Sequence, residues 1–349
     1  MAHRFWTLYI GSYSTPEVEG IHTYLFDREC ETFEKLGTIT GIENPSYLTV
    51  DSGHHHLYAV SEVEEGEVVA YKMDGDRILE LNRAKTGGSS PCYVEVVDHH
   101  LLTVNYMGGT ISAHAIEKKG SIGHMTDSIQ YEGSSKHVSR QEAPHPHTIV
   151  KDPHSDYVFV SDLGTDQIHV YSLNQETGQF NWVLSQSTQK GAGPRHFAFH
   201  PTLPYLFVSQ ELTSTIAVYK WLRETETLEY MASYRTLPAS FNGENTTSEL
   251  KISHSGNYIY CSNRGHDSLA VFRVQEDGEL TDLSLVSTKG QVPRHFNFLP
   301  TEDYLFVANQ DSDSIWLFRM SPDGQLIETN QSISVSKPVC IQVVEHQNR

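Results

Sequence analysis

Short apolar runs separated by polar turns recur along the whole of this 349-residue chain. The clearest runs are rich in Tyr, Val, Leu and Phe, end in small polar residues, and span residues 57–61, 157–161, 205–209, 258–262 and 304–308. Short runs of β-branched and aromatic residues bounded by turn residues are typical of β-strands. Because no helical or heptad periodicity extends over a useful length, the pattern predicts an all-β protein with almost no helix.

A shorter signature also repeats: an aliphatic residue, any residue, a small or aliphatic residue, and then Tyr, Phe or His. Its seven copies lie at residues 21–24, 68–71, 111–114, 168–171, 216–219, 269–272 and 315–318. They follow one another at intervals of about 45 residues, the period typical of a four-stranded propeller blade. In most units a further strand lies upstream and is marked by Pro45, Pro91, Pro146, Pro194 or Pro293. The repeat therefore predicts a seven-bladed β-propeller.

The two ends of the chain hold complementary parts of one blade. Residues 337–344 have the form of a first strand with no partner after it, whereas residues 5–40 supply three strands with none before them. Pairing these segments closes the ring and removes sheet edges that would otherwise recruit other chains. We therefore expect residues 1–349 to form a single propeller domain. Two longer polar segments, at residues 132–146 and 236–247, are expected to be loops.

Antiparallel geometry places polar side chains from many blades at one end of this propeller. If the first strand of a blade starts at the upper face, the second strand ends there, as does the loop to the next blade. First strands start with Tyr47, Tyr93, His145, His147, Arg195, His196, Glu249, Arg294 and His295, and second strands end with Tyr13, Glu62, Asn105, Tyr106, Asp162, Glu211, Arg264, Asn309 and Gln310. These residues are predicted to share one rim, with Arg195 and Glu211 as neighbours. The alternative for any single one is a polar group that only satisfies backbone or water.

The formal net charge of −19 restricts the possible partners. An acidic chain argues against nucleic acid, because phosphate neutralisation needs a basic patch. Arginines at a channel mouth would attract small anions selectively against that background. We expect no membrane association and no signal peptide, since there is no long apolar stretch and the N-terminal segment forms a strand over residues 5–10. The scattered Cys30, Cys92, Cys261 and Cys340 favour reduced thiols and thus a cytoplasmic protein. The expected state is a monomer or weak homodimer.

Motifs for a metal, a phosphate loop or a nucleophilic serine do not stand out. The tract His54-His55-His56 lies in a turn expected on the opposite face, and no Cys/His spacing typical of a metal site occurs elsewhere. A Gly-rich phosphate loop with a lysine and a GxSxG elbow are both missing from the sequence. We therefore expect neither a metal nor a cofactor.

Several motifs are similar to those of one known propeller family. They are His145-Pro146-His147, Gly193-Pro194-Arg195-His196 followed by Ser209-Gln210-Glu211, Ser262-Asn263-Arg264-Gly265, Pro293-Arg294-His295-Phe296, and the early Gly11-Ser12-Tyr13. Over essentially its whole length the chain resembles the lactonase family of seven-bladed propellers. That family includes bacterial propeller-type 6-phosphogluconolactonases and fungal carboxy-muconate cyclising enzymes.

The resemblance implies a catalytic set and a substrate class. In the cyclising relatives a histidine, two arginines and a glutamate are implicated, and the matching positions here are His147, Arg195, Glu211 and Arg264. The implied activity is a carboxylic ester hydrolase that opens 6-phosphoglucono-1,5-lactone to 6-phosphogluconate in the pentose phosphate pathway. Its partner would be a small anionic lactone or carboxylate. Two alternatives stay open: a lactonising enzyme acting on an unsaturated dicarboxylate, and a non-catalytic ligand-binding propeller.

Opening such a lactone needs a holder for the anion, a donor to the carbonyl oxygen, and a base that activates water. Arginine suits the first two tasks, and histidine or glutamate suits the third. We expect Arg264 and Arg294 to hold the anion, Arg195 to meet the carbonyl, and either His147 or Glu211 to act as base, the other orienting it. The predicted substrate-binding residues are His145, His196, Arg294, His295, Asn105 and Gln310. The 132–146 segment brings His137 and Arg140 as further candidates.

Overall fold

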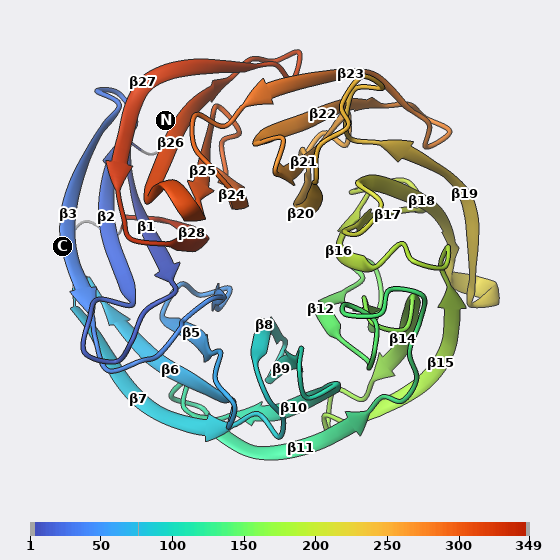
Figure 1. The fold of residues 1–349 in the computed structure, drawn as a ribbon. Helices are drawn as coiled ribbons and strands as arrows, with labels where there is room; N and C mark the ends of the chain where they lie inside the picture. The colour runs from blue at the N-terminus through green and yellow to red at the C-terminus, as the bar shows by residue number, and fades with distance from the viewer. Residues whose placement is uncertain (1–3, 76, 347–349) are drawn as a thin grey trace.

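The computed structural model describes residues 4–75 and 77–346, which form seven four-stranded antiparallel sheets. The sheets stand as blades in a ring, with one strand of each blade near the centre and the last strand at the outer edge (Figure 1). The seven-bladed all-β propeller predicted from the repeat is therefore confirmed.

Six blades follow one another along the chain, and each is built from four consecutive strands. The first three comprise β4 (Leu48–Val50), β5 (His56–Ser61), β6 (Glu67–Asp74) and β7 (Arg77–Lys85); β8 (Pro91–Val97), β9 (His100–Asn105), β10 (Thr110–Ile116) and β11 (Ile122–Gln130); and β12 (Pro146–Lys151), β13 (Tyr157–Asp162), β14 (Gln167–Leu173) and β15 (Phe180–Ser187). The next three comprise β16 (Pro194–Phe199), β17 (Tyr205–Gln210), β18 (Thr215–Leu222) and β19 (Thr227–Arg235); β20 (Thr246–Ile252), β21 (Tyr258–Arg264), β22 (Ser268–Val274) and β23 (Leu280–Ser287); and β24 (Pro293–Phe298), β25 (Tyr304–Asn309), β26 (Ser314–Met320) and β27 (Leu326–Ser334).

The seventh blade joins the two ends of the chain. It consists of β28 (Pro338–Glu345), β1 (Phe5–Ser12), β2 (Ile21–Asp27) and β3 (Thr32–Ile39), in that order from the centre outwards. Ile10 of β1 lies opposite Ile341 of β28 in an antiparallel ladder. Figure 1 shows the red C-terminal strand on the inner side of the blue N-terminal strands. The predicted closure by the C-terminal strand is confirmed.

The hydrophobic core lies mainly between neighbouring blades. Every residue of β17 is buried, whereas the outer strand β19 exposes about half of its residues. One interblade cluster joins Phe207 and Val218 to Ile259 and Phe272 of the next blade. Strands packed on both faces read as nearly continuous apolar runs, which is why the second strands gave the strongest signal in the sequence.

In six inner strands the pairing with the second strand shifts register close to the end where the inner strand begins. In β16 the shift falls between Pro194 and Phe197. Such a bulge re-aims the side chains around it. Consequently Arg195 and His196, although consecutive, reach two different groups of partners along the channel.

Helical structure is minimal, as predicted. Within the described residues it amounts to two 3-10 turns, η1 (Arg223–Thr225) and η2 (Gln310–Ser312). No helix in this part of the chain is long and apolar enough to cross a membrane.

Candidate active site

A cavity of about 220 Å³ opens where the second strands end, on the face predicted to carry the polar rim. The side chains lining it come from blades all round the ring: Glu62, Cys92, Tyr106, Arg140, His147, Glu211, Arg264 and Arg294. The structure thus brings together four of the predicted site residues, His147, Glu211, Arg264 and Arg294. A fifth, Arg195, is ion-paired with Glu211.

Glu211 lies at the centre of a cluster of three arginines. Its Oε2 is 2.9 Å from Arg195 Nε and 3.0 Å from Arg264 Nη2, and its Oε1 accepts a hydrogen bond from Arg140 Nη2. Only 3% of the Glu211 side chain is exposed. Burial on its own raises the pKa of this carboxyl, but the three guanidinium groups outweigh burial and lower the pKa to about 2. Glu211 is therefore a permanent carboxylate and a weak base.

The backbone before β16 explains how Arg195 reaches this carboxylate. Gly193 has a φ of +64°, and a Cβ there would lie 2.8 Å from Leu212 Cγ, so the turn requires glycine. The Gly193 N–H donates to Asp166 Oδ1 at 2.8 Å, and the Gly193 carbonyl accepts from the Glu211 N–H at 2.7 Å. This turn holds the start of β16 beside the residue that follows β17, which places Arg195 against Glu211.

Arg294 lines another part of the cavity. Its guanidinium lies over the Tyr13 ring, 5.3 Å from the ring centre, and the Tyr13 hydroxyl donates to Glu62 Oε2 at 3.2 Å. Burial lowers the pKa of Arg294, but Tyr13 and Glu62 outweigh it and raise that pKa above its ordinary value. Burial raises the pKa of Glu62, with Arg294 opposing. Within the described residues no carboxylate lies within ion-pair distance of Arg294, so its charge is directed at the cavity.

His147 is the imidazole of the cavity. Burial lowers its pKa well below the ordinary 6.5, and the positive charge of Arg195 nearby adds to the effect. Its Nδ1 is buried and has no hydrogen-bond partner among the described residues. The His147 ring also lies against the Tyr106 ring, with the two centres 5.7 Å apart. A neutral imidazole that lines a cavity keeps a nitrogen lone pair that can take a proton from water during a reaction, although the nearby arginines weaken it as a base.

Two predicted substrate-binding residues, His196 and His295, lie elsewhere in the channel. Their partner is Glu249: His196 Nδ1 is 3.1 Å from Glu249 Oε1, and His295 Nε2 is 3.1 Å from Oε2. Neither histidine lines the arginine cavity, whereas His196 and Glu249 line a separate cavity of about 290 Å³ with Lys251. The prediction that His196 and His295 lie on the rim is corrected. Alternate residues of an inner strand, and residues at its bulge, lie at different depths in the central channel.

The structure also places Asn105, Gln310 and His145 outside the cavity lining. Asn105 accepts from the Thr86 hydroxyl at 2.6 Å and donates to the Thr86 carbonyl, a pattern that Asn263 repeats with Thr236. Asn105 thus secures the loop between blades. Gln310 sits in η2 and donates to Asp311. His145 pairs with the Tyr106 carbonyl and stacks on the Tyr106 ring, so it supports a lining residue.

Arg140 is the residue whose contribution the sequence left most open. It lies in the 132–146 segment, and besides Glu211 it contacts the Tyr106 hydroxyl at 3.3 Å. Its side chain is 37% exposed, so it forms part of the outer wall of the cavity. His137 of the same segment is exposed and does not line the cavity. The sequence showed that residues 132–146 form an insertion, but it did not show where the backbone of this segment runs.

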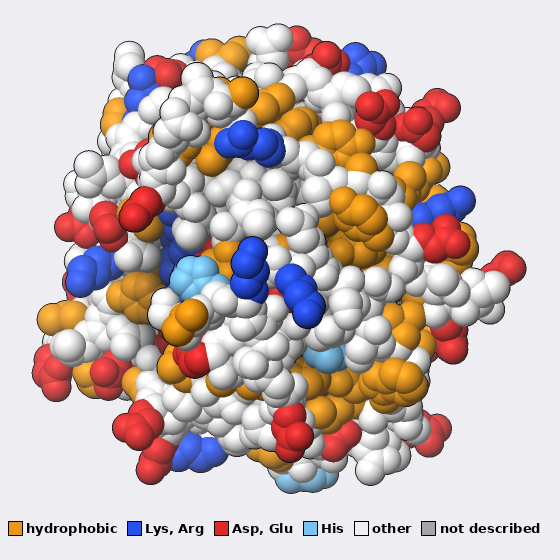
Figure 2. Space-filling model, turned by 45° about the vertical axis from the view of Figure 1, so that its right-hand side comes forward, with side chains coloured by type: hydrophobic (Ala, Val, Ile, Leu, Met, Phe, Trp, Pro, Cys, Tyr) orange, Lys and Arg blue, Asp and Glu red, His pale blue; other side chains and the backbone are white. Residues whose placement is uncertain are grey.

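In the view of Figure 2, some Lys and Arg side chains lie near the middle of the face and others at its edges, whereas Asp and Glu lie mainly at the periphery. Within residues 4–75 and 77–346, no group of three or more His, Cys, Asp and Glu is placed to hold a metal ion. In the His54-His55-His56 tract, His56 Nδ1 is 2.8 Å from Asp51 Oδ2.

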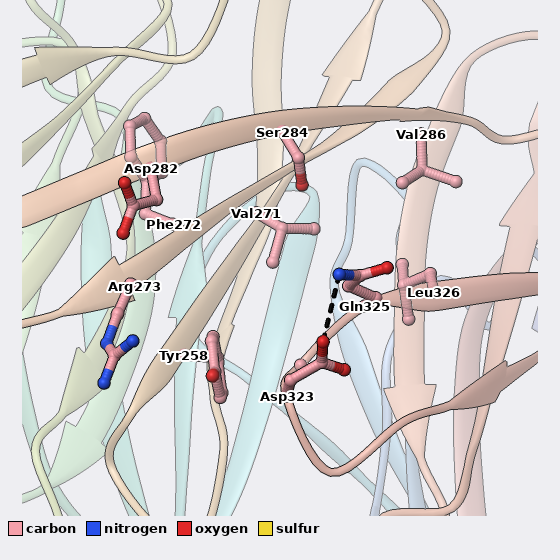
Figure 3. A pocket seen from close by; sticks show the side chains of 11 residues that line it. Tyr258, Val271, Phe272, Arg273, Asp282, Ser284, Val286, Asp323, Gln325 and Leu326 are labelled. Atoms are coloured by element: carbon pink, nitrogen blue, oxygen red, sulfur yellow. Dashed lines mark hydrogen bonds between the residues drawn. The ribbon is translucent and has the colours of Figure 1, made fainter.

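A groove of about 370 Å³ lies apart from this site, between two neighbouring blades (Figure 3). Strands β22 and β23 form one wall, and the turn before β27 forms the other. Its charged side chains Arg273, Asp282 and Asp323 are all exposed, and Gln325 donates to Asp323 at 3.0 Å. It lacks the buried, converging charges of the arginine cavity.

A family model described as a seven-bladed lactonase β-propeller matches residues 7–343. The chain belongs to this lactonase family. A 6-phosphogluconolactonase from Bacillus subtilis is 33% identical over 300 residues, which is 84% of this chain and 85% of that protein. Among solved structures, a protein from Lactobacillus plantarum superimposes with a TM-score of 0.92 at 31% identity, covering 98% of this chain and 100% of that one. The periplasmic gluconolactonase of Pseudomonas aeruginosa gives a TM-score of 0.91 at 28% identity, covering 97% and 99%. This lactonase-family propeller is thus similar to lactone-opening enzymes along almost its entire length.

Proposed function

We propose that this lactonase-family protein hydrolyses a phosphorylated sugar lactone, converting 6-phosphoglucono-1,5-lactone to 6-phosphogluconate. The observation that carries the proposal is one cavity that joins a neutral imidazole to an excess of converging positive charge. Three arginines, Arg140, Arg264 and Arg294, line the cavity together with the carboxylates Glu62 and Glu211, and a fourth, Arg195, is ion-paired with Glu211. In a protein of net charge −19 such a site attracts an anionic ligand. The name of the Bacillus subtilis relative supports this particular lactone.

Arg294 is the best-placed holder of the phosphate. It lines the cavity and contacts a tyrosine face rather than a carboxylate. Arg140, at the outer wall, is the second candidate. A guanidinium fork binds phosphate through two parallel hydrogen bonds, and binding deep in the site excludes the water that would weaken them.

Arg264 is the proposed donor to the carbonyl oxygen. It lines the cavity beside Glu211, and its Nε is buried and unpartnered among the described residues. Arg195, expected from the sequence to take this role, does not line the cavity and is only 2% exposed. We assign Arg195 to holding Glu211, and Glu211 to orienting the arginines that meet substrate.

His147 is the proposed base. Glu211, the alternative, carries a pKa of about 2 and is surrounded by three cations, so it is poorly suited to take a proton near neutral pH. His147 removes a proton from water as the water oxygen attacks the lactone carbonyl carbon. Arg264 donates to the resulting oxyanion, an interaction commonly worth about 3–4 kcal/mol in the transition state. The ring C–O bond then breaks, and the imidazolium returns its proton to the departing oxygen.

The test generates 6-phosphogluconolactone in situ and follows 6-phosphogluconate with a coupled dehydrogenase. Because the lactone also opens spontaneously, every rate is compared with the same reaction without protein. We expect a clear acceleration at micromolar protein, and a weaker one with unphosphorylated gluconolactone, which lacks the anion for Arg294. Equal rates with and without protein would refute the proposal. Turnover of an unsaturated dicarboxylate, read by ultraviolet absorbance, would then favour the lactonising alternative.

A further inference from the structure

The cluster of Glu249, His196 and His295 lies against the proposed base, His147. The rings of His147 and His196 are in contact, with their centres 5.2 Å apart and their planes at 62°. His196 in turn is 3.1 Å from the Glu249 carboxylate through Nδ1. Three buried side chains from the inner strands β12, β16 and β20 therefore form one continuous series, with exposed fractions of 6%, 4% and 3%.

The hydrogen-bond partners fix where the protons of this series lie. His295 Nδ1 accepts from the Ile341 N–H at 3.2 Å, so its proton is on Nε2, 3.1 Å from Glu249 Oε2. Facing a carboxylate oxygen, His196 Nδ1 carries the proton of that ring. This leaves a lone pair on His196 Nε2, which is buried and has no partner among the described residues. His147 Nδ1 is also buried and has no hydrogen-bond partner among the described residues.

The charged or titratable groups that act on His147 are Arg195, His196, Arg264, Arg294, Tyr106 and Cys92, whose thiol contacts the His147 carbonyl. The groups around Glu249 are His196, His295, Lys251, Arg195, Tyr47, Tyr93, Cys261 and Cys340. The immediate surroundings of His147 are thus rich in positive charge, which opposes a second positive charge on its ring.

We propose that Glu249 is a positioning residue that acts through His196 to stabilise the protonated form of His147 during lactone opening. The inference rests on the proposed function of His147 as base. When the His147 ring takes the proton of the attacking water, the new positive charge develops against the His196 ring, whose centre is 5.2 Å away. His196 Nδ1–H continues to face Glu249, so the carboxylate balances the new charge through an intervening ring. No proton leaves the series, and His147 returns its proton to the departing ring oxygen.

This arrangement explains why an acidic group is buried among histidines below an arginine site. Neutral side chains would be enough to hold the inner strands together, whereas stabilising a transient imidazolium requires a negative charge. Burial raises the pKa of Glu249, but His196 and the neighbouring cations outweigh it and hold the pKa far below its ordinary value, so the charge is permanent.

The variants Glu249→Gln and His196→Gln test the proposal. Glutamine keeps the size of Glu249 and an acceptor for His196 but removes the charge. Loss of that charge disfavours imidazolium, so the pKa of His147 falls and the acid limb of kcat/KM moves to lower pH, by about one pH unit. The maximal rate falls at least about tenfold, because the base becomes weaker. His196→Gln should give the same shift, and the double variant should be no worse than either single one.

Glu31→Gln is the control. Glu31 lies between β2 and β3 and is paired with Arg319, which lowers its pKa, so it carries its charge throughout the acid limb. Among the described residues it has no recorded contact with His196 or His147, so the acid limb should stay in place. An unchanged limb in Glu249→Gln, an equal shift in Glu31→Gln, or a shift in Glu249→Gln that His196→Gln does not reproduce would each overturn the proposal.

A measurement without turnover separates this inference from the proposed function. In protein labelled with ¹⁵N-histidine, the His147 signals are assigned by their loss in His147→Gln, and their titration is followed in the wild type and in Glu249→Gln. A lower His147 pKa in the variant supports this inference even if no lactone is opened, and an equal pKa overturns it. Lack of lactone opening by the wild type refutes only the proposed function. If Glu249→Gln does not fold, His196→Gln, which leaves Glu249 beside His295 and Lys251, supplies the same comparison.

Discussion

Arg140 and Glu211 lie 71 residues apart in the sequence, yet Arg140 Nη2 donates directly to Glu211 Oε1. One comes from the segment between β11 and β12, and the other follows β17. The contact ties a partly exposed insertion to the most buried carboxylate of the candidate site. It makes Arg140 the one member of the arginine cluster that can be removed without opening the interior.

Replacing Arg140 should therefore weaken substrate binding more than folding. In Arg140→Ala, Glu211 keeps two guanidinium partners, and the cavity loses one cation at its outer wall. We expect KM for the phosphorylated lactone to rise about tenfold, as for loss of one charge-assisted hydrogen bond, with a smaller change in kcat. Lys136→Ala, an exposed cation of the same segment, is the control and should leave KM unchanged. Equal effects of both variants would mean that only general attraction is involved.

Removing the charge of Glu211 should destabilise the whole protein. Glu211→Gln leaves three guanidinium groups, of which Arg195 is buried and Arg264 is 13% exposed, without their carboxylate, and losing one partner of a buried ion pair typically costs about 3–5 kcal/mol. The measurement is urea unfolding followed by tryptophan fluorescence. The matched change is Glu31→Gln, whose partner Arg319 is 57% exposed, and it should cost less than about 1 kcal/mol. Similar losses in both variants would contradict the account of the cluster.

The Glu211 carboxylate should also make the free energy of unfolding depend on pH under acidic conditions. The folded pKa of Glu211, about 2, lies below its unfolded value of about 4.3. Its stabilisation is then complete above pH ~4.3 and is lost as pH falls towards 2. The unfolding free energy of the wild type should decline more steeply across this window than that of Glu211→Gln. Parallel curves would show that Glu211 does not titrate as described.

Activity should respond to pH through His147 instead. Because burial and the nearby arginines hold the pKa of His147 well below 6.5, the imidazole stays neutral at and above that pH. We expect kcat/KM to be flat from pH 8 to 6.5 and to fall only at lower pH, as His147 becomes protonated. An acid limb with its midpoint at or above 6.5 would assign the base to another group.

The turn at Gly193 links folding to the site. Gly193→Ala combines a φ of +64° with a Cβ that would lie 2.8 Å from Leu212 Cγ, so it should both destabilise the protein and displace Arg195. Alanine substitutions at two other glycines separate the effect of the positive φ from the effect of the steric clash. Gly41 has a φ of +82° with open space around its Cβ position, and Gly37 has open space and no positive φ. Alanine should cost most at 193, about 1 kcal/mol at 41 and least at 37.

Much of this fold could be predicted because each blade repeats the same alternation of turns and apolar strands. The shared cavity of Glu62, Glu211, Arg264 and Arg294 also followed from the sequence, since strand direction alone brings first-strand starts and second-strand ends to one face. The depth at which each side chain lies along the channel could not be predicted from the sequence. His196 comes directly after Arg195, yet the bulge in β16 turns it towards Glu249.

Side chains at strand ends were a second source of error. Asn105 ends its strand where a rim residue should, but hydrogen bonds to Thr86 hold its side chain against the loop between two blades. The path of the 132–146 segment depends on tertiary contacts, such as that of Arg140 with Glu211, which no local pattern encodes. Fold and face were thus set by periodicity, and the partners of individual polar side chains were set by packing.

We propose that the protein opens a phosphorylated lactone in the arginine cavity, with His147 as the base. The most direct measurement is the rate of 6-phosphogluconate formation from freshly generated lactone by the wild type and by His147→Gln, each against the spontaneous rate. We predict a wild-type rate well above background and a loss of at least about a hundredfold in the variant, with KM little changed because the arginines remain. A His147→Gln rate equal to that of the wild type, or a wild-type rate equal to background, would contradict the account.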